Sequence, residues 1–210
     1  MKNLKILVLE GGYNEEHEVS IETGKQVKNA LKKLRINFDS ILVKPNDFKN
    51  DIKKYDNQYI CFNALHGTFG EDGTIQKILD LNNFKYTHSN FNSSKKGFNK
   101  YLTKKVIDAT MIPTPKYLIS NINDISERFI LEIYDEFGSF VLKPISSGSS
   151  FGINIFKKKT DIKLFFKNIK KNKKTYNNHE NILIEKYIEG RELTVSVVEK
   201  NKKNYAIEVT

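Results

Sequence analysis

A lysine, four serines and two glycines lie together in the segment KPISSGSSFG, which spans Lys143 to Gly152. The runs on either side of it, 140–142 and 153–156, have the composition of short strands. A Gly/Ser loop between two strands has little side-chain bulk, so its backbone N–H groups can approach an anion closely. Lys143 would add a point charge to the same anion. The segment therefore predicts a phosphate-binding loop, although an ordinary exposed hairpin turn has a similar composition.

Two further polar clusters follow predicted strands near the N-terminus. GGYNEEHEVS, residues 11–20, places three glutamates and a histidine after the first strand. NALHGTFGEDGTIQ, residues 63–76, places His66, Glu71 and Asp72 after the third. Each could be a plain polar loop, and Glu71 and Asp72 could merely begin a helix, where acidic residues are favourable. Together, in this order and beside the Gly/Ser loop, they indicate a ligand site.

Alternating strands and helices are expected to position the first two clusters. The predicted strands are 5–9, 39–43, 59–64 and 84–87. One helix is predicted over 19–34, and a second follows the loop 65–73 and continues to residue 81. The first helix is expected to bury one face, formed by Val19, Thr23, Val27, Ala30, Leu31 and Leu34. The pattern predicts an α/β domain over residues 1–92 with a mostly parallel sheet, whose strands bind ligands at their carboxyl ends.

The remaining residues predict a second, α+β domain and the start of a third. A boundary is expected at 89–94, where Asn and Ser replace the apolar periodicity. The second domain, 93–188, would contain helices 100–109 and 125–137, strands 117–119 and 181–187, and the Gly/Ser hairpin. Within 157–174, Leu164, Phe165 and Ile169 suggest a solvated amphipathic helix. A third domain, 189–210, would begin with two strands. The first covers 193–198, and the second follows a turn at 200–204 and continues to residue 209.

Composition excludes several classes of function. The net charge is +10, but arginine supplies only three of the 35 basic residues and the lysines are scattered, so we expect no nucleic-acid partner. No apolar run reaches the roughly 20 residues that cross a bilayer, and the N-terminal apolar stretch is too short for a signal peptide. We therefore expect a cytoplasmic protein without a membrane partner. The single cysteine, Cys61, lies in an apolar run and is expected in the core.

Four motifs together resemble the D-alanine:D-alanine ligase family, part of the ATP-grasp superfamily. They are the clusters at 11–20 and 63–76, the loop at 143–152, and IEKYIEGRELTV at 184–195, and they match the family in order and spacing over nearly the whole chain. The resemblance implies an N-terminal parallel α/β domain, an α+β ATP-grasp lid domain and the start of a third domain. It also implies an ATP-dependent ligase that makes D-alanyl-D-alanine for peptidoglycan and the cell wall through an acyl phosphate.

The resemblance also implies roles for individual residues. Glu16 would hold the ammonium of the first D-alanine beside His66, and Ser149 would position Glu16 and cover the reacting phosphate, which makes Glu16 and Ser149 the catalytic residues. The nucleotide would be held by the remaining set: Lys100, Lys143, Ser149 and Ser150 at the phosphates, Glu185, Lys186 and Ile188 at adenine, and Glu192 at the ribose. Mg²⁺ or Mn²⁺ and a homodimer through the N-terminal domain are expected of the complete enzyme.

The chain also differs from the family pattern. Phe98 and Asn99 stand before Lys100 where Met-Asp is usual, and Ile145, Ser146 and Ser147 stand where charged residues are frequent. The family's metal ligands lie beyond Thr210, so no metal ligand is assigned here and we expect little or no ligase activity from these 210 residues alone. Two alternatives stay open: a protein that binds nucleotide or D-alanine without turnover, and a related ligase that joins D-alanine to D-serine or D-lactate.

Overall fold

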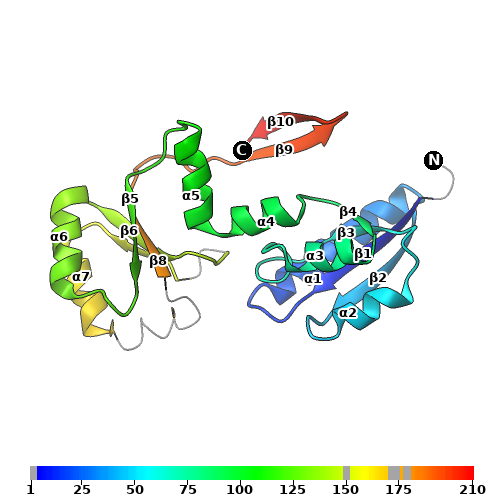
Figure 1. Ribbon diagram of the computed structural model, residues 1–210, viewed down its shortest axis with the longest axis horizontal. Helices are drawn as coiled ribbons and strands as arrows, with labels where there is room; N and C mark the ends of the chain where they lie inside the picture. Colours follow the sequence, from blue (N-terminus) through cyan, green and yellow to red (C-terminus); the bar gives the residue numbers. More distant parts are fainter. Residues whose placement is uncertain (1–3, 149–151, 170–175, 177–180) are drawn as a thin grey trace.

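The computed structural model describes residues 4–148, 152–169, 176 and 181–210, and it confirms the predicted α/β fold class. Two sheets stand at opposite ends of the molecule, with the helices α4 (Phe91–Phe98) and α5 (Lys100–Ala109) between them (Figure 1). The first sheet is parallel and the second is antiparallel. The expected domain limits, 1–92, 93–188 and 189–210, stay a prediction.

The first sheet has the strand order β2-β1-β3-β4, and all of its pairs are parallel. Its strands are β1 (Lys5–Gly11), β2 (Asn37–Val43), β3 (Ile60–Asn63) and β4 (Lys85–Tyr86). Side chains of β1 alternate between two faces. Ile6 and Val8 pack in one apolar cluster with Leu31 of α1 (His17–Lys33), whereas Leu7 and Leu9 pack in another. The second cluster is covered by α2 (Phe48–Asp51), η1 (Ile52–Lys54) and α3 (Thr74–Leu81).

A buried serine fastens the carboxyl ends of two strands to α1. The Ser20 side chain is fully buried, and its Oγ accepts a hydrogen bond from the Gly11 N–H at 2.8 Å. The same hydroxyl donates to the Ala64 carbonyl oxygen at 2.8 Å. Gly11 ends β1 and Ala64 follows β3, so one hydroxyl fixes the starting points of both polar loops.

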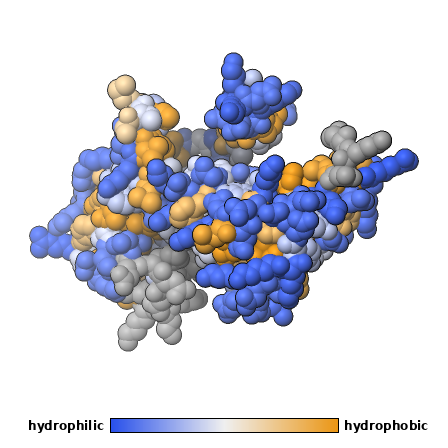
Figure 2. Space-filling model, turned by 45° about the vertical axis from the view of Figure 1, so that its right-hand side comes forward, coloured by the Kyte–Doolittle hydropathy of each residue, from blue (hydrophilic) through white to orange (hydrophobic). Residues whose placement is uncertain are grey.

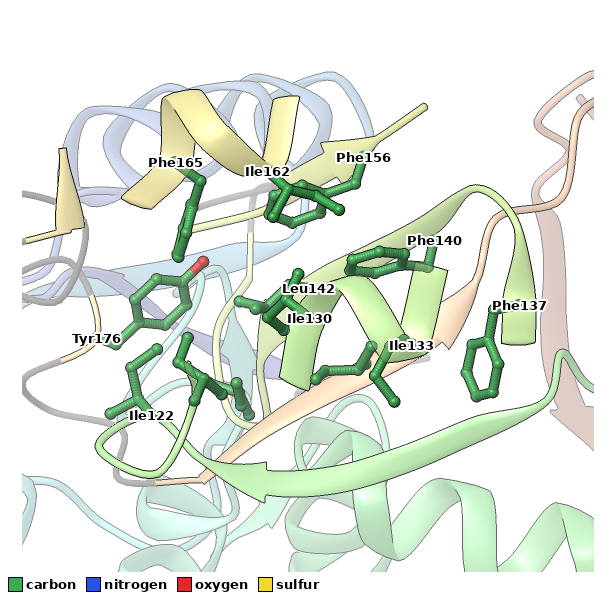
Figure 3. Close-up of a cluster of buried hydrophobic side chains, with 13 residues drawn as sticks. Ile122, Ile130, Ile133, Phe137, Phe140, Leu142, Phe156, Ile162, Phe165 and Tyr176 are labelled. Atoms are coloured by element: carbon green, nitrogen blue, oxygen red, sulfur yellow. The ribbon is translucent and has the colours of Figure 1, made fainter. Parts of the chain in front are cut away.

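The second sheet has the order β5-β8-β6-β7 and contains the predicted Gly/Ser hairpin. Its strands are β5 (Tyr117–Asn121), β6 (Phe140–Pro144), β7 (Asn154–Phe156) and β8 (Asn181–Lys186). The helices α6 (Glu127–Phe137) and α7 (Lys159–Lys167) pack on it through an apolar cluster (Figure 3). Phe140 and Phe156 stack with their ring centroids 4.7 Å apart, and Phe156 meets Phe165 of α7 edge to face.

The last two strands form an antiparallel hairpin that stands away from both sheets. These strands are β9 (Val195–Lys200) and β10 (Lys203–Val209), and every residue in them is exposed. The space-filling view shows the hairpin as a separate lobe (Figure 2). The predicted pair of strands in this region is therefore confirmed.

Several sequence expectations were wrong in detail. The sequence expectations miss two helical segments, 48–54 and the start of α4 at Phe91, whereas the domain boundary expected at 89–94 stays a prediction. Asn90 caps α4, because its side chain accepts from the Ser93 N–H at 3.0 Å. On α1 the buried residues are Ser20, Gly24 and Leu31, while Val19 and Leu34 are exposed. On α7 the buried residues are Ile162 and Phe165, while Leu164 is exposed.

Removal of the Ser20 hydroxyl should destabilise the first sheet. Ser20→Ala leaves the buried Gly11 N–H and Ala64 carbonyl without their partner, so we expect a loss of about 2 kcal/mol in the free energy of unfolding. Urea denaturation measures it. Ser40→Ala, at an exposed position of β2, is the control and should stay within about 0.5 kcal/mol of the parent. Equal stability of the two variants would contradict this role of Ser20.

Candidate active site

Glu16 and His66, expected on the amino-acid side of the site, lie on two loops that Asn14 ties together. The Asn14 Nδ2 donates to the carbonyl oxygens of His66 at 2.7 Å and Thr68 at 3.0 Å. Its Oδ1 accepts from the Glu16 N–H at 3.0 Å. Asn14 therefore holds the residue before α1 against the loop after β3. The sequence places Asn14 inside the first polar cluster, but its amide was not singled out.

The His66 ring is held from both sides. Its Nε2 lies 2.9 Å from the Thr23 Oγ1, and its Nδ1 lies 3.7 Å from the Glu71 Oε1. The pKa of the half-exposed Glu71 is raised, first by partial burial and further by the charge of Glu16. A hydrogen bond from the Gly67 backbone and the proximity of His66 oppose that shift. The Thr23 hydroxyl thus orients the His66 ring, and the Glu71 carboxylate lies beside it.

Two glycines approach the Glu16 carboxylate from different parts of the chain. A Cβ added to Gly67 would lie 2.4 Å from the Glu16 Oε2, and one added to Gly148 would lie 3.1 Å from the same atom. Gly67 also has φ +67°, a conformation that favours glycine, whereas Gly148 needs glycine only for the close approach. Gly148 belongs to the Gly/Ser loop, so that loop meets the predicted amine-binding carboxylate directly.

Lys100 lies at the other end of the same loop. Its backbone N–H donates to the Ile145 carbonyl oxygen at 2.9 Å, and its Nζ donates to the Ser147 carbonyl oxygen at 2.6 Å. The Lys100 pKa is lowered to about 8, first by burial and then by the charge of Lys143, against the opposing effect of Glu185. A bound anion would offset both of the effects that lower this pKa.

Lys143 and Glu185 are brought together by the pairing of β6 with β8, and a second lysine joins them. The Lys143 Nζ donates to the Glu185 Oε1, and the Lys104 Nζ lies 2.9 Å from the Glu185 Oε2. Burial pushes the pKa of Glu185 upward, but hydrogen bonds from Lys143 and Lys104 outweigh it and leave the pKa lowered. Lys104 was missed in the sequence, although its position four residues after Lys100 places both on one helix face.

A cavity of about 570 Å³ lies between His66 and Lys100, and its lining includes neither Glu16, Lys143 nor Glu185. It is lined by His66, Glu71 and His88 on the side of the first sheet, and by Lys100, Ser147 and Gly148 on the side of the loop. Gly97 and Phe98 of α4 complete the wall between them. An amino acid near His66 and a phosphate near Lys100 would therefore share one open cavity.

The expected adenine residues lie at the end of β8. Lys186 and Tyr187 donate their backbone N–H groups to the carbonyl oxygens of Lys116 at 2.8 Å and Ser139 at 2.9 Å. The strand ends at Lys186, so the backbone of Ile188 lies beyond the sheet, and its side chain is exposed. Glu192 is exposed as well. The structure does not bring Lys186, Ile188 or Glu192 into the cavity lined by Lys100, and their nucleotide roles stay predictions.

Two of the expected residues, Ser149 and Ser150, lie outside the described residues. Within the described ranges, no group of three or more His, Cys, Asp or Glu side chains is placed to hold a metal ion. The same part of the chain has no helix long and apolar enough to span a bilayer. Cys61 is buried as expected, and burial raises its thiol pKa to about 12, which disfavours a thiolate nucleophile.

Comparisons with known proteins point to one family. The family model described as "D-ala D-ala ligase C-terminus" matches residues 106–210. The D-alanine–D-alanine ligase of Pelagibacter ubique is 38% identical over 98% of this chain, and that of Wolbachia pipientis wMel is 37% identical over 92%. The chain spans 64% and 58% of these two relatives.

Solved structures agree with this similarity. The D-alanyl-alanine synthetase A of Vibrio cholerae matches with a TM-score of 0.82 and 25% identity, over 100% of this chain and 66% of that protein. The D-alanine–D-alanine ligase of Bacillus anthracis complexed with ATP matches with a TM-score of 0.73 and 27% identity, over 98% of this chain and 71% of that protein.

Binding of an anion beside Lys100 should cause this lysine to take up protons near pH 8. Because the Lys100 pKa is about 8, about half of these side chains are neutral at that pH, and a nearby negative charge raises the pKa again. We expect tripolyphosphate to bind with uptake of about half a proton per site at pH 8 and to bind more weakly as the pH rises further. Titration calorimetry in buffers of different ionisation enthalpy measures this uptake.

The matched variants are Lys100→Met, which should abolish the uptake, and Lys96→Met at an exposed position of α4, which should retain it. Undiminished uptake in Lys100→Met would assign the proton to another group.

Proposed function

This chain belongs to the D-alanine–D-alanine ligase family, and on that premise we propose that it serves the ATP-dependent joining of two D-alanine molecules. The dipeptide D-alanyl-D-alanine is a building block of peptidoglycan, so the proposed role is in cell-wall synthesis. The relatives' names favour D-alanine over D-serine or D-lactate as the second substrate. Because the reaction consumes ATP, we place it in the cytoplasm, and the family resemblance favours a homodimer.

One observation carries the proposal: the Gly/Ser loop reaches from the lysines to Glu16. Lys100 donates to Ser147 of that loop, and the next residue, Gly148, lies against the Glu16 carboxylate. A carboxylate suits an ammonium ion, and lysines suit phosphate oxygens. The amine of an amino acid at Glu16 and the terminal phosphate of a nucleotide at Lys100 would thus lie on the two sides of one short segment.

The proposed reaction has two steps. A carboxylate oxygen of the first D-alanine attacks the γ-phosphorus of ATP, and ADP leaves as the acyl phosphate forms. The amine of the second D-alanine, after losing a proton from its ammonium form, attacks the acyl carbon, and inorganic phosphate leaves. Each step gathers negative charge on phosphoryl or carbonyl oxygens, so positioning and electrostatic stabilisation dominate.

The chain's own residues supply parts of that stabilisation. Glu16 would anchor the first ammonium, with the His66 ring beside it. Lys100 and Lys143 would neutralise phosphate oxygens. The proposed roles of Ser149 and Ser150 are to cover the reacting phosphate, and a closed loop would keep water from hydrolysing the acyl phosphate.

Turnover separates the ligase from a binding protein. Release of inorganic phosphate from ATP, dependent on D-alanine and magnesium, would support the ligase. Binding of both ligands in calorimetry without phosphate release would fit both the alternative of a protein that binds without turnover and the little activity expected from these 210 residues alone.

Loss of the Lys143 ammonium should weaken ATP binding. Lys143→Ala removes a charge-assisted hydrogen bond to phosphate, so we expect a loss of about 1.5 to 3 kcal/mol in binding free energy. Titration calorimetry with ATP measures the change. Lys163→Ala removes an exposed lysine of α7 and should bind ATP like the parent chain. Unchanged ATP affinity in Lys143→Ala would count against a phosphate role for this lysine.

Glu16→Gln should affect D-alanine and not the nucleotide. The amide keeps the size of the side chain but removes the charge that faces the ammonium, so D-alanine affinity should fall by about tenfold or more. ATP affinity should stay within about twofold, because Glu16 lies against Gly148 and is not a partner of Lys100 or Lys143 in the described hydrogen bonds and ion pairs. Calorimetry with each ligand separately provides both values. Glu18→Gln, an exposed position on α1, is the control, and equal D-alanine affinity in both variants would argue against Glu16.

A further inference from the structure

Lys104 is the only buried residue of α5, a helix that the structure describes in full. Lysine is almost never buried without a partner. The Lys104 ammonium has three acceptors: the Glu185 Oε2 at 2.9 Å, the Thr114 Oγ1, and the Pro115 carbonyl oxygen at 3.3 Å. The three hydrogens of the ammonium are thus all used, and the Tyr117 ring centroid lies 5.0 Å from the Nζ.

Lys143 is held far less firmly. Its ammonium has a single acceptor among the described residues, the Glu185 Oε1. Its side chain is 20% exposed, compared with 9% for Lys104 and 12% for Glu185. Lys143 stands on β6, one residue before that strand ends and the Gly/Ser loop begins. The Glu185 Oε2 is therefore paired with a lysine that further acceptors hold in place. The Oε1 is paired with Lys143, a more exposed lysine that has no second acceptor among the described residues.

We propose that Lys104 is a positioning residue for Lys143: it keeps Glu185 compensated, so that Lys143 can move from this carboxylate to a phosphate. The phosphate role of Lys143 rests on the proposed function, whereas the coupling of Lys104 to Lys143 through Glu185 does not. Without Lys104, the departure of Lys143 would leave a buried carboxylate without a counter-charge, which is strongly unfavourable. Glu185 would then retain Lys143 and oppose its transfer to the nucleotide.

The coupling predicts how readily Lys143 is acylated. Acetic anhydride reacts with an amine that is free and unprotonated, so pairing with Glu185 protects Lys143. We expect Lys104→Met to slow labelling of Lys143 by about fivefold, because Glu185 then has no other partner. Lys104→Met/Glu185→Gln should restore fast labelling. Competitive labelling followed by mass spectrometry measures the rate, and thermal unfolding checks that each variant is folded.

The matched control is Lys105→Met, which removes the same charge from an exposed position of the same helix. It should leave the labelling of Lys143 unchanged. If Lys104→Met does not fold, the comparison is between Glu185→Gln and Lys104→Met/Glu185→Gln. Lys143 should then label equally in both, because Lys104 acts only through Glu185. A difference of more than about threefold between them would overturn the coupling.

ATP affinity then tests the functional part. Lys104→Met should weaken ATP binding by about tenfold. Measured against Glu185→Gln alone, so that any contact of Glu185 with adenine cancels, Lys104→Met/Glu185→Gln should show recovery of most of that loss. A purely structural role for Lys104 predicts no such recovery. If labelling follows the coupling but no variant, including the parent, binds ATP, the proposed function fails and the coupling stands. If Lys104→Met leaves the labelling of Lys143 unchanged, the coupling fails even where ATP binds.

Discussion

Two lysine ammonium groups share the buried Glu185 carboxylate, and the charge of the proposed phosphate site depends on that arrangement. Burial alone would push Glu185 toward its neutral form, and the lysines keep it ionised. The charge of Glu185 also acts on Lys100, because it opposes the lowering of the Lys100 pKa. One carboxylate facing three lysines leaves an excess of positive charge in a partly enclosed place. Such an excess of positive charge favours a polyphosphate over ligands that carry no negative charge.

The amino-acid side depends on short polar bridges between loops. Ser20 fastens the ends of β1 and β3 to α1, and Asn14 then fastens the loops that follow these strands. Glu16 and His66 are distant in sequence, yet two side chains fix their separation. Because both bridges are made within the first sheet and its helix, this half of the site is preorganised without help from the second sheet.

The sequence predicts the fold well where patterns are local. Alternating strands and helices, the Gly/Ser hairpin and the buried Cys61 follow from periodicity and composition. The capped helix α4 could have been found from Asn90, whereas the buried face of α1 could not, because Ser20 and Gly24 are buried for their small size and hydrogen bonding rather than for hydrophobicity. Glu16, His66, Lys100 and Lys143 come from motifs. Lys104 belongs to none of these motifs, and in a lysine-rich chain nothing in the sequence marks which lysine is buried. The pairing of Glu185 with two lysines also depends on elements that only the tertiary fold brings together.

The close approach of Gly67 and Gly148 to the Glu16 carboxylate constrains which residues can replace these glycines in related sequences. A methyl group on either glycine would crowd the Glu16 Oε2, so a larger residue at position 67 or 148 would require the Glu16 carboxylate to shift. If position 16 were shortened to aspartate, the crowding at Gly148 would be relieved, whereas Gly67 would still be constrained by its φ of +67°. The residues at positions 16 and 148 should therefore vary together among homologous sequences, although their loops belong to different sheets.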